Sequence, residues 1–293
     1  MNGKIRIGIS GWRYAPWRKA FYPRNLPQRR ELEFASREFG SIEINGSFYS
    51  LQTPQRYAAW YADTPAGFQF SVKGPRFITH IRRLREVKKP LANFFASGIF
   101  ELREKLGPIL WQLPPSLRYD PELIENFLRL LPHDTVAARD LARRREPRMK
   151  GRAALSIDSK RRLRHALEVR HDSFRDERFI KQLRRHRVAL VVADTAGKWP
   201  HLEDLTSDIV YIRLHGADEL YASGYTAQAL SRWGGRIRRW RHGTQPARGP
   251  RVSHRAPARR ASRDVYCYFD NDRKVKAPVD AHSLEQWLHD RGE

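Results

Sequence analysis

The stretch Val188-Ala189-Leu190-Val191-Val192-Ala193-Asp194 is an almost unbroken apolar run that ends in a carboxylate. Such a run is typical of a strand in a parallel sheet, because helices cover both faces of that sheet. Further runs of the same kind occur at 5–10, 41–45, 68–73, 109–113, 165–170, 209–214 and 265–270. All are short and rich in Val, Ile, Phe and Tyr, so the sequence predicts eight buried strands.

Helical signals lie between most of these runs. Thr53-Pro54 and Asp120-Pro121 each combine an N-cap residue with a proline at the first helical position, a common way for a helix to begin. Helices are expected at 28–39, 55–62, 88–105, 122–131, 176–186, 227–241 and 278–289. The repeated strand–helix alternation predicts an α/β protein with a closed TIM-type (β/α)8 barrel.

The length of 293 residues fits one barrel of this type with surface insertions, because such a barrel needs roughly 250 residues. We therefore expect a single domain over residues 1–293. Two basic segments, 139–164 and 244–263, break the strand–helix pattern. The second is rich in Arg, Ala and Pro and contains no acidic residue, so it is predicted to be a flexible surface loop.

The formal net charge is +24, from 56 basic and 32 acidic residues. This excess favours polyanionic partners, above all nucleic acid, although an arginine-biased surface gives the same excess without such a partner. The only cysteine, Cys267, excludes an intramolecular disulfide framework and a cysteine-based zinc cluster. The sequence shows neither a signal segment nor an apolar run near the roughly 18 residues of a membrane span. A cytoplasmic protein with no membrane partner is expected, and its oligomeric state is left open.

The C-terminal ends of the predicted strands carry polar side chains, and this is the end at which a βα barrel forms its active site. Residues two apart in a strand share a face, which places Glu43 with Asn45 and Arg213 with His215. Buried charges are costly unless they are paired. The strand ends therefore predict a ring of acids and bases around a polar pocket. The alternative is a purely structural network in which the same charges only neutralise one another.

General acid–base or hydrolytic chemistry is the class that these residues favour, if the protein is an enzyme. The residues expected to be catalytic are Glu43, Lys73, Glu168, Asp194 and His215. The residues expected to bind substrate are Trp12, Asn45, Tyr49, Gln112, Arg170, Arg213 and Asn271. A Schiff base at Lys73 is a further alternative, which a neighbouring carboxylate would oppose.

No cofactor and no metal site are predicted. The carboxylates at the strand ends and His215 offer ligands for a divalent metal, but His-x-His and HExxH spacings are absent. The absence of GxSxG, P-loop and GxGxxG motifs excludes serine hydrolases of that type, P-loop NTPases and standard dinucleotide-binding proteins. The first loop, 10–17, joins aromatic residues to arginine. It is expected either to stack on nucleobases or to pack over the barrel mouth.

Several motifs are spread over nearly the whole chain. They are Ile7-Gly8-Ile9-Ser10-Gly11-Trp12, Ile42-Glu43-Ile44-Asn45 with Phe48-Tyr49, Phe70-Ser71-Val72-Lys73 with Ile78-Thr79-His80, Gly107-Pro108-Ile109-Leu110-Trp111-Gln112-Leu113-Pro114-Pro115, Glu168-Val169-Arg170-His171 with Ser173-Phe174, Tyr211-Ile212-Arg213-Leu214-His215-Gly216 and Tyr268-Phe269-Asp270-Asn271-Asp272. Together they resemble the domain of unknown function 72 family (DUF72), also called YecE-like. The resemblance implies a TIM-type barrel and no established activity.

The chain departs from the family pattern at Gly46 and Asp270, where serine or threonine and asparagine are expected, and in the segment 244–263. The fold class is also similar to endonuclease IV and xylose-isomerase-like barrels, an analogy that transfers no mechanism. The histidine-rich metal set of endonuclease IV has no clear counterpart in this sequence.

Two functional hypotheses follow. The first is an enzyme whose polar pocket binds a small anionic or phosphorylated substrate. The alternative is a nucleic-acid-binding protein, possibly phosphodiester-cleaving, that uses the basic segments for affinity. The first predicts positive charge concentrated at the strand ends, and the second predicts a basic stripe that spreads away from the mouth of the barrel.

Overall fold

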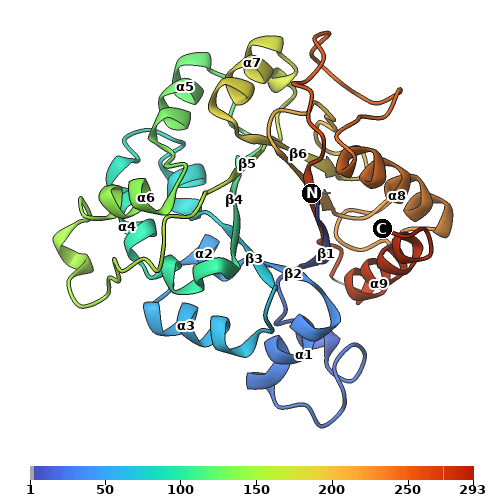
Figure 1. Ribbon diagram of the computed structural model, residues 1–293, viewed down its shortest axis with the longest axis horizontal. Helices are drawn as coiled ribbons and strands as arrows, with labels where there is room; N and C mark the ends of the chain where they lie inside the picture. Colours follow the sequence, from blue (N-terminus) through green and yellow to red (C-terminus); the bar gives the residue numbers. More distant parts are fainter. Residues whose placement is uncertain (1–2, 273) are drawn as a thin grey trace.

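The computed structural model describes residues 3–272 and 274–293 and contains a closed barrel of parallel strands in the order β1 to β8 (Figure 1). The strands are β1 (Ile5–Ser10), β2 (Ser41–Ile44), β3 (Gln69–Lys73), β4 (Leu106–Gln112), β5 (His165–Glu168), β6 (Ala189–Asp194), β7 (Ile209–Leu214) and β8 (Asp264–Phe269). Pairing of β1 with β8 closes the sheet. The expected TIM-type (β/α)8 barrel is confirmed. The domain predicted over 1–293 also includes residues 1, 2 and 273, which lie outside the described part.

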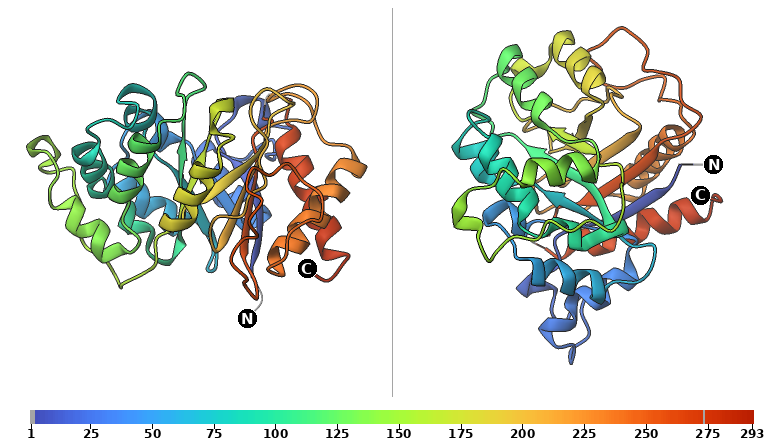
Figure 2. Two further views of the ribbon diagram at one scale, coloured as in Figure 1. Left: turned by 90° about the horizontal axis from the view of Figure 1, so that it is seen from above. Right: turned by 60° about the vertical axis from the view of Figure 1, so that its left-hand side comes forward.

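Helices surround the strands on all sides (Figure 2). They are α1 (Glu31–Glu38), α2 (Gly46–Tyr49), α3 (Pro54–Asp63), α4 (Lys88–Ala96), α5 (Pro121–Leu130), α6 (Thr135–Ala142), α7 (Glu177–His186), α8 (Ala227–Arg241) and α9 (Lys276–His289). Both predicted N-caps are present, because Thr53 accepts a hydrogen bond from a backbone N–H of α3 and Asp120 accepts two from α5. None of the helices in the described residues has both the length and the apolar character that a membrane span needs.

The prediction of one continuous helix over 88–105 is wrong. The structure has two shorter helical segments there, α4 and a 3-10 helix, Ile99–Lys105. The break lies at Gly98, whose φ of +105° belongs to the left-handed region. A Cβ atom at this position would lie 2.4 Å from the Cα of Pro54. The chain therefore turns where only glycine can approach the start of α3. Helix α6 was not expected and occupies the beginning of the basic segment 139–164.

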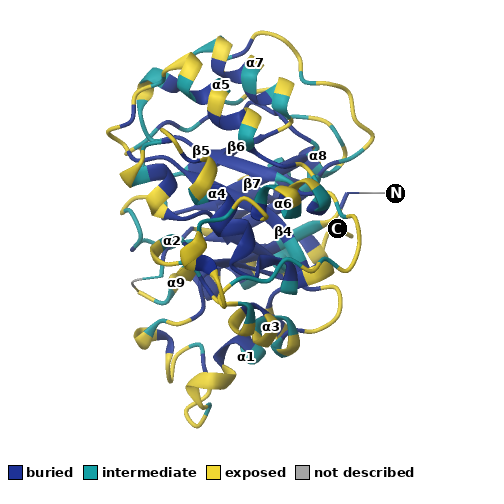
Figure 3. Cartoon of the chain, turned by 90° about the vertical axis from the view of Figure 1, so that its left-hand side faces the viewer, coloured by how far each residue is buried: buried dark blue, intermediate teal, exposed yellow. Residues whose placement is uncertain are grey.

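The interior of the barrel is filled by side chains and is not an open channel. Leucine, isoleucine, valine and alanine side chains share it with Tyr211, Tyr266 and Tyr268. The tyrosine hydroxyls find partners inside, since Tyr268 lies 2.7 Å from the Ser41 hydroxyl and Tyr266 donates to Gln69. A larger apolar cluster separates the barrel from the helices, so the strands are buried on both faces (Figure 3).

Residues 244–263 form no helix or strand and project as the orange-red loop at the upper right of Figure 1. Hydrogen bonds attach the loop to the rest of the fold at several points. Asp204 accepts hydrogen bonds from the backbone N–H groups of Val252 and Ser253. At the end of the loop, the buried Arg263 donates to three backbone carbonyls. The irregular structure is as expected, and the mobility of the loop stays a prediction.

Candidate active site at the C-terminal ends of the strands

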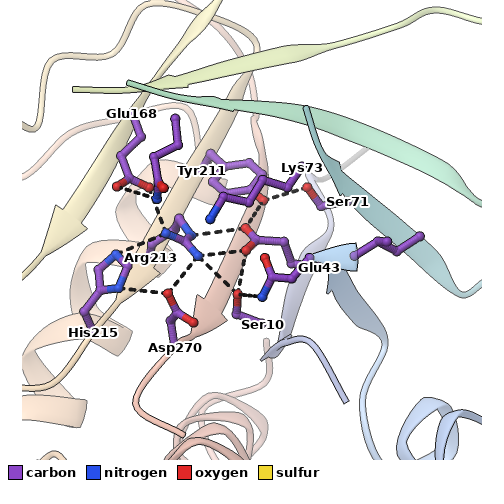
Figure 4. Close-up of polar contacts among 12 residues, drawn as sticks. Ser10, Glu43, Ser71, Lys73, Glu168, Tyr211, Arg213, His215 and Asp270 are labelled. Atoms are coloured by element: carbon purple, nitrogen blue, oxygen red, sulfur yellow. Dashed lines mark hydrogen bonds and ion pairs between the residues drawn. The ribbon is translucent and has the colours of Figure 1, made fainter. Parts of the chain in front are cut away.

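The centre of the site is Arg213, a fully buried side chain on β7. Its guanidinium donates to Glu43 on β2 at 2.8 Å, to Glu168 on β5 at 2.9 Å and to Asp270, just after β8, at 2.8 Å (Figure 4). Glu168 also accepts from Arg170 at 2.7 Å. Three carboxylates thus share two guanidinium groups, and these contacts meet the requirement that buried charges be paired.

Glu43 is completely enclosed by donors. The hydroxyls of Ser10 and Tyr211 donate to its two oxygens at 2.5 and 2.6 Å, and Arg213 donates to both. Asn45 donates in turn to the Ser10 hydroxyl at 3.0 Å. Each of the two carboxylate oxygens of Glu43 therefore accepts two hydrogen bonds. These bonds link Glu43 on β2 to β1 and β7.

The charges of this network set the protonation of its members. Burial alone would raise the pKa of Glu168, but Arg170 and Arg213 outweigh it and hold the pKa well below the ordinary value. Burial and Arg213 likewise act in opposite directions on the pKa of Asp270, and the net shift is downward. Burial and the charge of Arg213 lower the pKa of His215. Both carboxylates are therefore ionised at neutral pH, and the imidazole is neutral.

The tautomer of His215 follows from its neighbours. Its Nε2 lies 3.3 Å from Nη1 of Arg213, a group that can only donate, so Nε2 is the acceptor. The proton of the neutral ring is then on Nδ1, which lies 3.0 Å from Asp270. The neutral ring of His215 thus lies between Arg213 and Asp270, with Nε2 facing Arg213 and Nδ1 facing Asp270.

A pocket of about 700 Å³ opens beside this network. The residues that line it come from the C-terminal ends of the strands and from the segments that follow them. A βα barrel forms its active site at this end. The lining residues are Tyr14, Asn45, Phe48, Tyr49, Lys73, Arg76, His80, Ile81, Gln112, Arg170, Tyr221, Asp270 and Asp272. Asp270 belongs to both the network and the lining, so it connects the buried charges to the pocket.

Lys73, at the end of β3, is the unusual cation of this pocket. Its side chain is 8% exposed, and its Nζ lies 4.4 Å from the centre of the Phe48 ring. Among the described residues, no oxygen accepts a hydrogen bond or an ion pair from this nitrogen. Burial and then the charge of Arg213 lower the pKa of Lys73 to about 8, against the opposing effect of the nearby carboxylates.

Most of the residues expected to form the site do meet at this end of the barrel. Besides the network and Lys73, Gln112 donates to Glu168 at 3.0 Å, and Asn45 and Tyr49 line the pocket. In the part of the chain that the structure describes, no three His, Cys, Asp or Glu side chains are arranged to hold a metal ion.

Three expected residues lie outside both the charge network and the pocket lining because other contacts hold them. Trp12 is buried and packs edge-on against Trp60, with ring centres 5.4 Å apart. Asp194 accepts from Tyr225 at 3.2 Å. Asn271 donates to Ser223 and Asp280. Trp17 is also buried, so the first loop packs its tryptophans inward, and its contribution to the pocket lining is Tyr14.

Asp270 was absent from the expected catalytic set, although it ends the eighth apolar run. The rule that placed Glu168 and Arg213 at the active end applies equally to Asp270. Tyr221 lines the pocket from a turn after β7, and His80 lines it from the π-helix Phe77–Ile81 after β3. The motif Ile78-Thr79-His80 includes His80 but does not show which of its side chains turns inward, and none of the quoted motifs includes Tyr221.

Comparisons with known proteins show which family the chain is similar to. The family described as "Protein of unknown function DUF72" matches residues 6–293. UPF0759 protein YunF of Bacillus subtilis is 28% identical over 116 residues, which cover 38% of this chain and 40% of that protein. UPF0759 protein YecE of Escherichia coli is 28% identical over 110 residues, 38% of each chain. The chain thus aligns with about two-fifths of the length of these relatives.

Solved structures extend the likeness to the whole fold. A DUF72 family protein from Thermotoga maritima superposes with a TM-score of 0.73 at 22% identity, covering 98% of this chain and 99% of the other. A DUF72 family protein from Enterococcus faecalis gives a TM-score of 0.68 at 16% identity, covering 97% and 95%. At these identities the likeness shows a shared fold and nothing further.

Proposed function

The chain belongs to the family of proteins of unknown function DUF72, and from this premise we propose that it is an enzyme whose pocket binds a small anionic or phosphorylated substrate. The observation that carries the proposal is Lys73, a nearly buried cation that has no acceptor among the described residues and lies in a pocket of about 700 Å³. A buried ammonium is unfavourable unless a partner compensates it. An anionic group of a substrate supplies that partner.

The rest of the pocket supports this interpretation. Arg76 and Arg170 line it together with Lys73, so that donors converge from the ends of β3 and β5. Asp270 is ionised and lines the pocket, which makes it the general base in this proposal. Its position is fixed by Arg213 and His215. Groups held by packing and hydrogen bonds in this way meet the requirement for a preorganised site.

Inorganic phosphate is the simplest probe of this proposal. It should raise the unfolding temperature of the wild-type protein, because a ligand that binds only the native state stabilises it by about 2.7 kcal/mol at a concentration roughly 100 times its Kd. Lys73→Met should abolish the response. Lys88→Met, which changes an exposed lysine, should leave it unchanged. A wild-type protein that responds neither to phosphate nor to a panel of sugar phosphates and carboxylates would contradict the proposal.

Nucleic-acid binding is the second candidate, and one observation favours it. Two hollows that share Lys160, Arg161 and Arg162 lie at the opposite end of the barrel, near the starts of β3, β4 and β5. The mouth itself is balanced, since Lys73 and three arginines face four carboxylates there. The basic excess therefore lies away from the strand ends, as the second hypothesis predicts.

The basic hollows are nevertheless partly neutralised. Lys160 pairs with Asp134, Arg161 with Asp158, and Arg162 with Asp208. This pairing is why we rank the pocket enzyme first. A labelled duplex titrated at two salt concentrations tests the second candidate, because each phosphate contact contributes about −0.9 to the slope of log affinity against log salt.

The test needs a variant that removes charge without touching the pocket. Neutralising Arg143, Arg144, Arg145 and Arg148 together should weaken binding to all sequences alike and flatten the salt slope, since phosphate contacts carry no sequence information. If the wild-type protein does not bind the duplex at low salt, the second candidate fails and the charge is surface composition.

A further inference from the structure

The described chain contains two buried lysines at the barrel, and their surroundings differ sharply. Lys105 is 4% exposed and donates all its protons, to the backbone oxygens of Tyr61 and Thr64 at 2.7 and 2.6 Å and to the Thr64 hydroxyl at 3.1 Å. Lys73 is 8% exposed and has no such acceptor, only the face of Phe48. Lys105 thus has three oxygen acceptors for its ammonium protons, and Lys73 has none among the described residues.

The carboxylates near Lys73 are already engaged. Glu43 and Asp270 each bind Arg213 at 2.8 Å, and Glu168 binds Arg213 and Arg170. The objection to a Schiff base at this lysine was that a neighbouring carboxylate would keep the amine protonated. In the structure three carboxylates do raise the pKa of Lys73, but burial and the positive charge of Arg213 outweigh them, so the net shift is downward.

We propose that Lys73 is a nucleophilic amine that forms an imine with an aldehyde or ketone substrate bearing an anionic group. The inference rests on the proposed function, because it uses the same pocket. Burial and Arg213 lower the pKa of Lys73 to about 8. A far larger fraction of its amine is therefore unprotonated at neutral pH than for an exposed lysine, whose pKa is about 10.4. Arg76 and Arg170 line the pocket and can bind the anionic group.

The reaction needs no oxidant, reductant or second cofactor. The lone pair of Nζ attacks the carbonyl carbon, a C–N bond forms, and the carbonyl oxygen takes up a proton. A proton leaves the nitrogen for the ionised carboxylate of Asp270 or for water in the pocket. The protonated carboxyl or water in the pocket then gives a proton to the hydroxyl of the carbinolamine, the C–O bond breaks as water leaves, and the nitrogen lone pair forms the C=N bond of a protonated imine. One water is released for each imine formed.

Reductive trapping tests the inference on the wild-type chain. The protein is incubated with glycolaldehyde phosphate and cyanoborohydride, which converts an imine into a stable secondary amine, and peptide mass spectrometry then compares labelling rates at Lys73 and at the exposed Lys88. At neutral pH Lys73 should label at least about tenfold faster, because of its lower pKa. Its rate should level off above a pH of about 8 while the rate at Lys88 keeps rising.

Two further arms separate this inference from the proposed function. Lys73→Arg keeps the charge and cannot form an imine, so it should lose trapping at this position. Lys88→Arg is the matched control and should leave labelling of Lys73 unchanged. Labelling of wild-type Lys73 no faster than Lys88, with the phosphate response intact, would overturn the inference and leave the proposed function standing. A wild-type protein that responds neither to phosphate nor to the panel of sugar phosphates and carboxylates would overturn the proposed function.

Discussion

Replacing Arg213 with methionine should cost about 3–5 kcal/mol of unfolding free energy at neutral pH, the usual penalty for removing one partner of a buried ion pair. The structure makes this variant severe. Arg213 is fully buried and binds Glu43, Glu168 and Asp270 at 2.8 to 2.9 Å. Methionine is similar in length to arginine and leaves no large cavity. The decrease in unfolding free energy therefore measures the effect of leaving the buried carboxylates without their partner.

The penalty should shrink as the pH falls. In the wild-type protein the pKa values of Glu168 and Asp270 are lowered, so the stability they contribute is present above the ordinary carboxyl pKa and is lost as the pH falls through their folded values. Without Arg213, the charge that most lowers the pKa of Asp270 is gone, so that pKa should rise, while Arg170 still lowers the pKa of Glu168. The difference in unfolding free energy between the two proteins therefore shrinks as the pH falls through the raised pKa of Asp270.

Urea unfolding of both proteins at neutral and mildly acidic pH measures the two effects. Arg162→Met is the control, because Arg162 is 49% exposed and its partner Asp208 keeps a second contact from Arg164. This control should cost no more than about 1 kcal/mol at either pH. A loss for Arg213→Met no larger than that of the control, or one that grows on acidification, would refute the reasoning.

Three other predictions follow from the fold. Gly98→Ala should destabilise the protein by about 2–4 kcal/mol in urea unfolding, since the left-handed φ and the contact with Pro54 both oppose a side chain; an unchanged midpoint would contradict this account. Asp120→Ala should cost about 1 kcal/mol in the same assay through loss of the cap of α5. Limited trypsin digestion should cut within 244–263 before it cuts any strand, as mass spectrometry of early fragments will show; survival of this loop would count against its predicted mobility.

The sequence was most informative where one physical signal dominated. The run that ends at Asp194 contains almost only apolar side chains, so its burial on both faces and its place in a parallel sheet could be predicted. Thr53 and Asp120 located helix starts because an N-cap is a local feature. Gly98 was missed because its role depends on Pro54, which is distant in sequence. A contact of that kind has no local signature.

The same distinction applies to the site. Strand-end position correctly brought Glu43, Glu168 and Arg213 together, because parallel strands end on one face. It could not show which carboxylates pair with Arg213, since that depends on how far each side chain reaches across the barrel. Trp12 was expected in the pocket because aromatics beside arginine suggest stacking, whereas the structure packs it into the core. The direction of a side chain in a loop is set by tertiary packing.

The contacts of Arg213 also constrain the order in which the chain can fold. Arg213 contacts Glu43, which lies 170 positions earlier in the chain, and Asp270, which lies 57 positions later. Contacts so distant in sequence form late and slowly, because the intervening chain must first be ordered. A chain still being synthesised can pair β1 to β7, but it lacks the last carboxylate and the strand that closes the barrel. A chain that ends before β8 therefore lacks Asp270 and Asp272 of the pocket lining, and the lining is complete only when β8 lies between β1 and β7.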